Sequence, residues 1–140
     1  MLTAFMINAV VIALVVGLHY EFLRRLSGIM PHLPVAPRAR ILVGVFGALV
    51  AHVFEIWIIA AVYWFKIQAD GFGHLAGEIG NGFWDCVYFS FITYTTVGYG
   101  DIYPIGLIRY LAGLESLIGL LLITWTASFL FVEMSRNWHR

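Results

Sequence analysis

Residues 95–101 are the stretch of this 140-residue chain whose residue types and spacing best suit a chemical role. The stretch reads Thr95, Thr96, Val97, Gly98, Tyr99, Gly100 and Asp101. Because glycine adopts positive φ angles at no steric cost, the two alternating glycines let the chain turn successive backbone carbonyls to one side. A row of carbonyl oxygens can replace the water around a dehydrated cation, and the Thr96 hydroxyl can add a further ligand. The stretch therefore predicts a cation site built from backbone oxygens.

Composition places the chain among integral membrane proteins. It is 61% hydrophobic and 11% charged, whereas soluble domains are about 45–50% apolar and about 25% charged. A length of 140 residues allows one domain with about three spans of roughly 20 residues. Eight basic residues balance eight acidic ones, and no basic cluster with interleaved aromatic residues suggests nucleic-acid binding.

Enzymatic chemistry finds no support in the residue pattern. Cys86 is the single cysteine, so neither an intrachain disulfide nor a cysteine-rich metal site is expected. We find no Ser/His/Asp arrangement, phosphate-binding loop or metal-ligand spacing, and the five histidines are scattered. We therefore expect no enzyme, no organic cofactor and no organic substrate.

Three apolar stretches are long enough to cross a membrane. The predicted spans are an extra N-terminal helix over 1–23, an outer helix over 41–65 and an inner helix over 107–132. A retained helix is favoured over a signal peptide for the first stretch. No Lys or Arg precedes residue 24, and no small-residue cleavage pattern follows.

Basic residues orient these spans. The linker 24–40 carries four arginines and no acid, and the short tail 133–140 is also basic. By the positive-inside rule both segments are cytoplasmic, which places the N-terminus outside and predicts a multi-pass protein of the cell (plasma or inner) membrane. Because Pro31, Pro34 and Pro37 disfavour helix, we expect the linker to be extended along the headgroups.

Two shorter segments lie between the outer and inner helices. Residues 66–82 hold five glycines and no periodicity, which predicts an extracellular loop. Residues 83–94 are apolar and aromatic but too short to span, which fits a re-entrant helix. Asp85 in its first turn would oppose the positive end of the helix dipole. Such a helix would end directly at residues 95–101.

Residues 41–132, with their TTVGYGD stretch between a short helix and an apolar span, resemble the two-helix pore module of prokaryotic potassium channels with one helix added in front. The resemblance implies an all-α membrane protein that forms a homotetramer, because four filter loops must surround one axis. It also implies K⁺ ligation by the carbonyls of Thr96, Val97, Gly98 and Tyr99 and by the Thr96 hydroxyl. The implied function is passive, K⁺-selective conduction across the lipid bilayer.

Two other functions stay open beside this one. The first is a cation channel with weaker selectivity, against which Tyr99 argues because relatives that relax selectivity commonly change that position. The second is a non-conducting regulatory subunit, against which the intact filter argues. No span carries Arg at every third position, so we expect no voltage sensor of the usual kind.

The residues around the filter differ from those of many relatives. In many relatives two pore-helix tryptophans surround the filter tyrosine, and in some a pore-helix glutamate pairs with the filter aspartate. We predict that Asp101 instead accepts a hydrogen bond from Tyr88, with Trp84 as the second choice. The predicted filter support comprises Thr95, Gly100, Asp101, Tyr88, Phe89, Ile92 and Glu115.

Polar residues within the spans are candidate functional residues, because an ionisable group at that depth is costly. Glu115 could accept hydrogen bonds from Ser90 or Thr93 and brace the filter from behind, or it could pair with His52. His52 and Glu55 lie one helical turn apart. They form either a proton-sensitive gating pair or a hydrogen-bonded packing contact, of which we favour the second.

Gly119 lies within the predicted inner helix, where relatives carry a glycine that acts as a gating hinge. Glycine in a helix interior costs about 0.5–1 kcal/mol relative to alanine. Gly119 is therefore either a hinge or a site of close helix packing.

Overall fold

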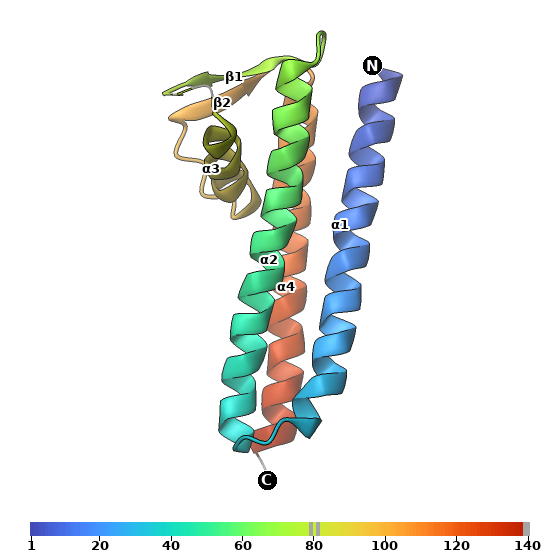
Figure 1. Cartoon of the computed structure of the whole chain (residues 1–140), viewed down its shortest axis with the longest axis vertical. Coiled ribbons are helices and arrows are strands. Elements are labelled where there is room, and N and C mark those ends of the chain that lie inside the picture. The colour runs from blue at the N-terminus through green and yellow to red at the C-terminus, as the bar shows by residue number, and fades with distance from the viewer. Residues whose placement is uncertain (79, 81, 139–140) are drawn as a thin grey trace.

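A computed structural model describes residues 1–78, 80 and 82–138. Three long helices run along its long axis: α1 (Leu2–Ile29), α2 (Pro37–Gln68) and α4 (Ile108–Trp138) (Figure 1). Three described segments are long and apolar enough to cross a membrane, namely Leu2–His32, Ala39–Gln68 and Ile108–Arg136. The number of spans agrees with the sequence-based expectation, and the chain is a multi-pass membrane protein.

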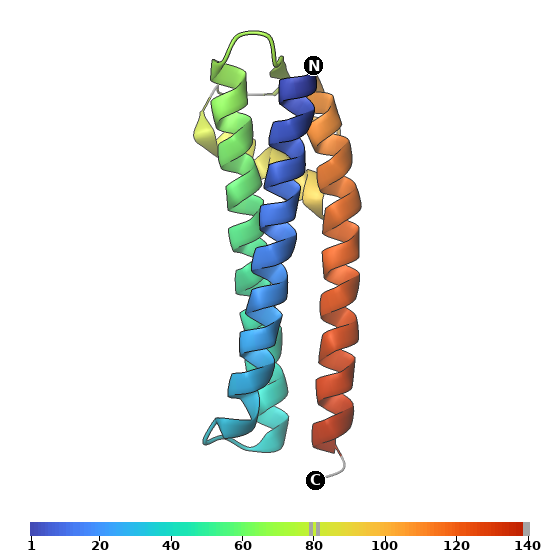
Figure 2. The ribbon, with the colours of Figure 1, turned by 90° about the vertical axis from the view of Figure 1, so that its right-hand side faces the viewer.

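The short helix α3 (Phe83–Tyr94) packs against α2 and α4, on the side that faces away from α1 (Figures 1 and 2). Its bounds match the predicted re-entrant helix. Oδ2 of Asp85 accepts hydrogen bonds from the backbone N–H groups of Gly80 and Gly82, both at 2.9 Å. The carboxylate thus satisfies donors at the helix start, where its charge also complements the dipole.

A small antiparallel sheet closes the end of the molecule at which the N-terminus lies (Figure 1). Strand β1 (His74–Gly77) pairs with β2 (Ile102–Ile105), from His74 opposite Ile105 to Gly77 opposite Ile102. The prediction of an irregular loop over 66–82 is therefore wrong for β1, and the purely helical fold class needs this addition. The close pairing explains why two positions in this region are glycine. A Cβ on Gly73 or Gly77 would lie 1.9 Å from a carbonyl oxygen of the opposite strand segment, and both have positive φ.

The prediction of an extended linker over 24–40 is wrong for most of its length. Helix α1 continues to Ile29, and a 3₁₀ turn (Met30–His32) follows it. Glu21 accepts hydrogen bonds from Arg24 and Arg25, one turn further on, which stabilises the extension. Pro31 and Pro37 fall at helix starts, where a missing N–H costs nothing, and Pro34 lies in the non-helical connection between them.

The other two long helices also exceed their predicted bounds. Helix α2 spans Pro37–Gln68 rather than 41–65, and α4 reaches Trp138 rather than residue 132. Most of the predicted tail 133–140 is thus helical, and residues 139–140 lie outside the described part. A contact of 3.4 Å between Arg136 and Glu133 supports this last turn. Hydropathy marks the apolar part of a span, whereas the helix continues past it.

The core lies between α2, α3 and α4. Its largest fully buried apolar side chains are Tyr63, Tyr94, Ile59, Ile108, Leu111 and Leu122. Large apolar side chains nevertheless stay exposed along all three long helices, for example Phe5, Phe54 and Phe131. An exposed apolar surface of this extent suits contact with lipid or with other subunits.

Candidate functional site

The backbone of residues 95–101 alternates as the sequence analysis expects. Thr96, Gly98 and Gly100 have positive φ angles of 60°, 52° and 83°, whereas Val97 and Tyr99 do not. A side chain makes positive φ unfavourable, so Thr96 adopts a conformation that only surrounding structure can hold. The sequence predicts positive φ at the glycines, whereas the residue type of Thr96 gives no sign of its positive φ.

The end of α3 anchors this stretch. The backbone N–H of Thr96 donates to the carbonyl of Thr93 and that of Gly98 to the carbonyl of Ile92, both at 3.0 Å. The Thr95 hydroxyl donates to the Phe91 carbonyl at 2.6 Å. The start of the stretch is thus fixed to the helix that precedes it, whereas its side chains from Thr95 to Tyr99 are exposed in the single chain.

The predicted bond between Tyr88 and Asp101 is confirmed. The Tyr88 hydroxyl donates to Asp101 Oδ2 at 2.6 Å, and Oδ1 accepts the Ile102 N–H at 3.0 Å. The Tyr88 bond lowers the pKa of Asp101, and the same bond raises the pKa of Tyr88 to about 12. Trp84, the second choice, packs edge-on against Trp57 instead.

Other predicted support residues do not surround the filter tyrosine within one chain. Tyr99 is 74% exposed. Phe89 is buried and packs edge-on against Tyr63 at 5.1 Å between ring centroids. Ile92 is buried and offers its backbone carbonyl to Gly98. An aromatic surround of Tyr99 stays a prediction that would need residues of other subunits.

Glu115 is a buried brace between three helices. It is fully buried, and it accepts a hydrogen bond from Ser90 of α3 at 2.5 Å and one from Tyr63 of α2 at 2.7 Å. The predicted Ser90 bond is confirmed, and the alternative pairing with His52 is wrong. The bond from Tyr63, which lies 52 positions away, is not predicted from the sequence.

Gly119 lies where α4 meets the end of α3. A Cβ at this position would be 2.1 Å from the carbonyl oxygen of Tyr94. This contact supports the close-packing interpretation of Gly119. The hinge interpretation stays a prediction.

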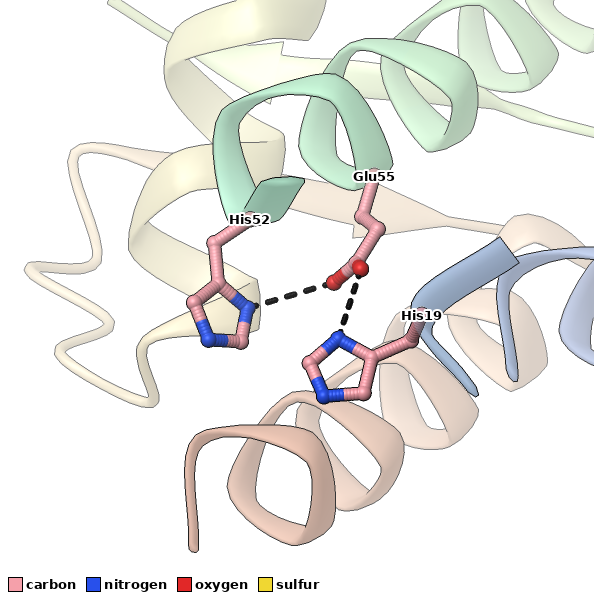
Figure 3. A group of neighbouring side chains, drawn as sticks. All are labelled: His19, His52 and Glu55. Carbon is pink, nitrogen blue, oxygen red and sulfur yellow. Dashed lines mark hydrogen bonds and ion pairs between the residues drawn. The ribbon is translucent and has the colours of Figure 1, made fainter. Parts of the chain in front are cut away.

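His52 and Glu55 belong to a larger buried network that the sequence analysis did not foresee. His52 Nδ1 lies 3.2 Å from Glu55 Oε2, and His19 Nδ1 of α1 lies 2.8 Å from Glu55 Oε1 (Figure 3). The Tyr94 hydroxyl donates to Glu55 Oε2 at 2.5 Å. Thr126 of α4 contacts both imidazoles. His19 is a polar residue in an apolar helix, the signal that singled out Glu115.

Comparison with known proteins agrees with this geometry. The family model described as "Ion channel" matches residues 40–136, more than half of the chain. The protein "Potassium channel K2" of Plasmodium falciparum is 32% identical over 98 residues. That match covers 70% of this chain but only 6% of the relative's length. No solved structure matches. The matches support the resemblance to potassium channels, and the chain belongs to the ion channel family.

Proposed function

We propose that the chain is one protomer of a K⁺-selective channel and that residues 96–99 are its ion-binding filter. The alternating φ angles at Thr96, Gly98 and Gly100 carry this proposal, because this alternation lets successive carbonyls face one axis. The carbonyls of Thr96, Val97, Gly98 and Tyr99, with the Thr96 hydroxyl, would replace the water around K⁺. The potassium-channel name of the similar Plasmodium protein supports the choice of ion.

The filter cannot close around an ion within one chain. One copy supplies one row of carbonyls, and its side chains from Thr95 to Tyr99 are exposed. Four copies around an axis would bury this face and surround the ion on all sides. The proposed assembly is therefore a homotetramer in which α3 is the pore helix, α4 the inner helix and α2 the outer helix.

The proposed orientation places the filter end outside the cell. The N-terminus lies at the same end of the molecule as the sheet, and the C-terminus at the other (Figure 1). The connection between α1 and α2 lies at the C-terminal end. The helix ends that flank it carry Arg24, Arg25, Arg38 and Arg40, and the positive-inside rule makes this end cytoplasmic. The negative end of the α3 dipole would then favour a cation below the filter.

The proposal is tested by reconstituting the purified protein into lipid vesicles and measuring K⁺ flux, with its mass in detergent as a second readout. We expect flux and the mass of four chains. A monomeric mass or the absence of flux would overturn the proposal.

A further inference from the structure

His19, His52 and Glu55 meet inside the helix bundle, away from the proposed filter. One ligand atom from each lies within 4.8 Å of the others. His19 and Glu55 are buried, and the two imidazoles point from α1 and α2 toward the two oxygens of one carboxylate (Figure 3). Residues from two different helices thus present two imidazole nitrogens and a carboxylate to one place.

The hydrogen bonds of this cluster depend on which ring nitrogen of each imidazole carries the proton. A neutral imidazole carries one ring proton. If both Nδ1 atoms donate to Glu55, both Nε2 atoms must accept. Their neighbour is the single hydroxyl of Thr126, 3.3 Å from His19 Nε2 and 3.0 Å from His52 Nε2. A hydroxyl donates one proton, so in that arrangement one Nε2 is left without a donor. All four ring nitrogens have partners if His52 Nδ1 instead accepts from the Tyr94 hydroxyl and its Nε2 donates to Thr126.

We propose that the cluster of His19, His52 and Glu55 binds a divalent transition metal ion of the zinc class through both Nδ1 atoms and the carboxylate. Two imidazoles and a carboxylate are a ligand set that zinc takes in proteins. Ligands about 2.0–2.1 Å from a tetrahedral zinc ion lie about 3.3 Å apart. The observed Nδ1-to-oxygen distances are 2.8 and 3.2 Å, so small side-chain rotations open the site.

Metal binding is also compatible with the contacts that Thr126 makes to both rings. With Nδ1 on the metal, each imidazole carries its proton on Nε2. The Thr126 oxygen has two lone pairs and can accept both N–H groups at the observed distances. Metal-bound histidines generally donate their second ring N–H to such an oxygen. Thr126 would therefore hold both imidazole rings in place without touching the metal itself.

The metal would act on the end of α3. The Tyr94 hydroxyl lies 2.9 Å from His52 Nδ1 and donates to Glu55, so it contacts two of the three proposed ligand residues. Tyr94 is the last residue of α3 and directly precedes the filter stretch. A bound metal would compete with Tyr94 for both partners and change how the filter is held. This effect on conduction rests on the proposed function, whereas the binding itself does not.

A path to the cluster exists from one side. A groove between α2, α3 and α4 is lined by His52, Tyr94 and Thr126 together with apolar residues such as Leu49 and Ile123. The His52 side chain retains 13% exposure. An ion in this groove can reach the cluster without unfolding a helix.

The test is a titration of the purified full-length protein in detergent with Zn²⁺, followed by calorimetry, and with Co²⁺, followed by its visible absorption. We expect one ion per chain and a tetrahedral Co²⁺ spectrum. His19→Gln, His52→Gln and Glu55→Gln should each weaken binding by about 10-fold or more. The control variant His74→Gln, at an exposed position in β1, should bind as the parent does.

A pair of variants at Thr126 separates metal binding from packing. Thr126→Val removes the oxygen but keeps the shape, and should weaken binding by about 10–100-fold. Thr126→Ser should retain it. Absence of saturable binding would overturn the proposal. Binding that His74→Gln abolishes, or that survives in Glu55→Gln, would also overturn it.

A flux measurement tests the effect on the filter. Zn²⁺ should change K⁺ flux in the parent and leave His19→Gln unaffected. Since binding is measured without flux, a protein that binds metal but does not conduct would contradict the proposed function and leave the site standing.

Discussion

The carbonyl oxygen of Tyr94 occupies the space that a side chain on Gly119 would need. An added Cβ would lie 2.1 Å from this oxygen. Helix α4 therefore touches the backbone of α3 directly, at the residue before the filter stretch. Because Gly119 has no side chain, the end of α3 can lie directly against α4.

We predict that Gly119→Ala destabilises the protein by about 1–3 kcal/mol, because a side chain forced into a packed contact shifts both backbones. Thermal unfolding in detergent measures this. Gly113→Ala, in the same helix with nothing within 4 Å of the added Cβ, should be neutral or slightly stabilising in this assay. A Gly119→Ala protein of unchanged stability but altered gating would favour the hinge interpretation.

The bond between Tyr88 and Asp101 predicts a dependence on pH. Because the Tyr88 hydroxyl stabilises the carboxylate, the folded-state pKa of Asp101 lies below its ordinary value. The resulting stability is present above the ordinary pKa of about 4 and is lost as pH falls through the lowered folded-state value.

Tyr88→Phe removes this bond and should raise the pKa of Asp101 toward its ordinary value. The loss of flux at acidic pH should then begin at a higher pH, and the filter should inactivate faster at neutral pH. Vesicle flux across pH, with NMR titration of labelled aspartate, measures both. An unchanged Asp101 pKa and unchanged inactivation would show that Tyr88 does not support the filter.

Glu115 should show which of its two hydrogen bonds matters for stability. Ser90→Ala and Tyr63→Phe each remove one donor from a fully buried carboxylate. Each should cost about 1–3 kcal/mol, because the remaining acceptor stays buried. Glu115→Gln should cost less than Glu115→Ala, since an amide retains one acceptor oxygen. Thermal unfolding gives all four values, and unchanged stability of Glu115→Gln, Ser90→Ala and Tyr63→Phe beside a loss for Glu115→Ala would mean that Glu115 only fills space.

The N-terminal helix should depend on one polar contact. Lys66 of α2 donates a hydrogen bond to Asn8 of α1, and both are buried. Asn8→Leu leaves the lysine without this acceptor and should weaken the docking of α1 by about 1.5–3 kcal/mol. Adding Lys66→Met should restore much of the loss. Hydrogen exchange in α1 reports both, and no difference between single and double variants would exclude this role for the pair.

Local patterns predicted much of this structure. Hydropathy located three spans, and the break between the loop glycines and the apolar run located α3 to the residue. The filter motif and its spacing led to the Tyr88–Asp101 bond, and the expense of burying Glu115 led to the Ser90 bond. Each of these inferences rests on a change in composition along the chain or on a sequence motif.

The contacts of α1 and the pairing of the two strands were not predictable from the sequence. His19 and Glu55 are 36 positions apart. They meet because of the way α1 is rotated about its own axis against α2, and this rotation cannot be read from a single sequence. Strands β1 and β2 are four residues each and form only through each other. Helices α1, α2 and α4 extend past their predicted ends because the helix continues beyond the apolar run that predicts a span. The positive φ of Thr96 arises from its surroundings and not from its residue type.

The most direct test of the proposed channel compares K⁺ with Na⁺ flux in vesicles that contain the parent protein or Gly98→Ala. An alanine at the positive φ of Gly98 strains the filter although the space around it is open. Gly28→Ala, in an open position of α1, is the matched control. The parent and the control should pass K⁺ about tenfold or more faster than Na⁺, and Gly98→Ala should lose this preference. Equal K⁺ and Na⁺ flux through the parent would contradict the account.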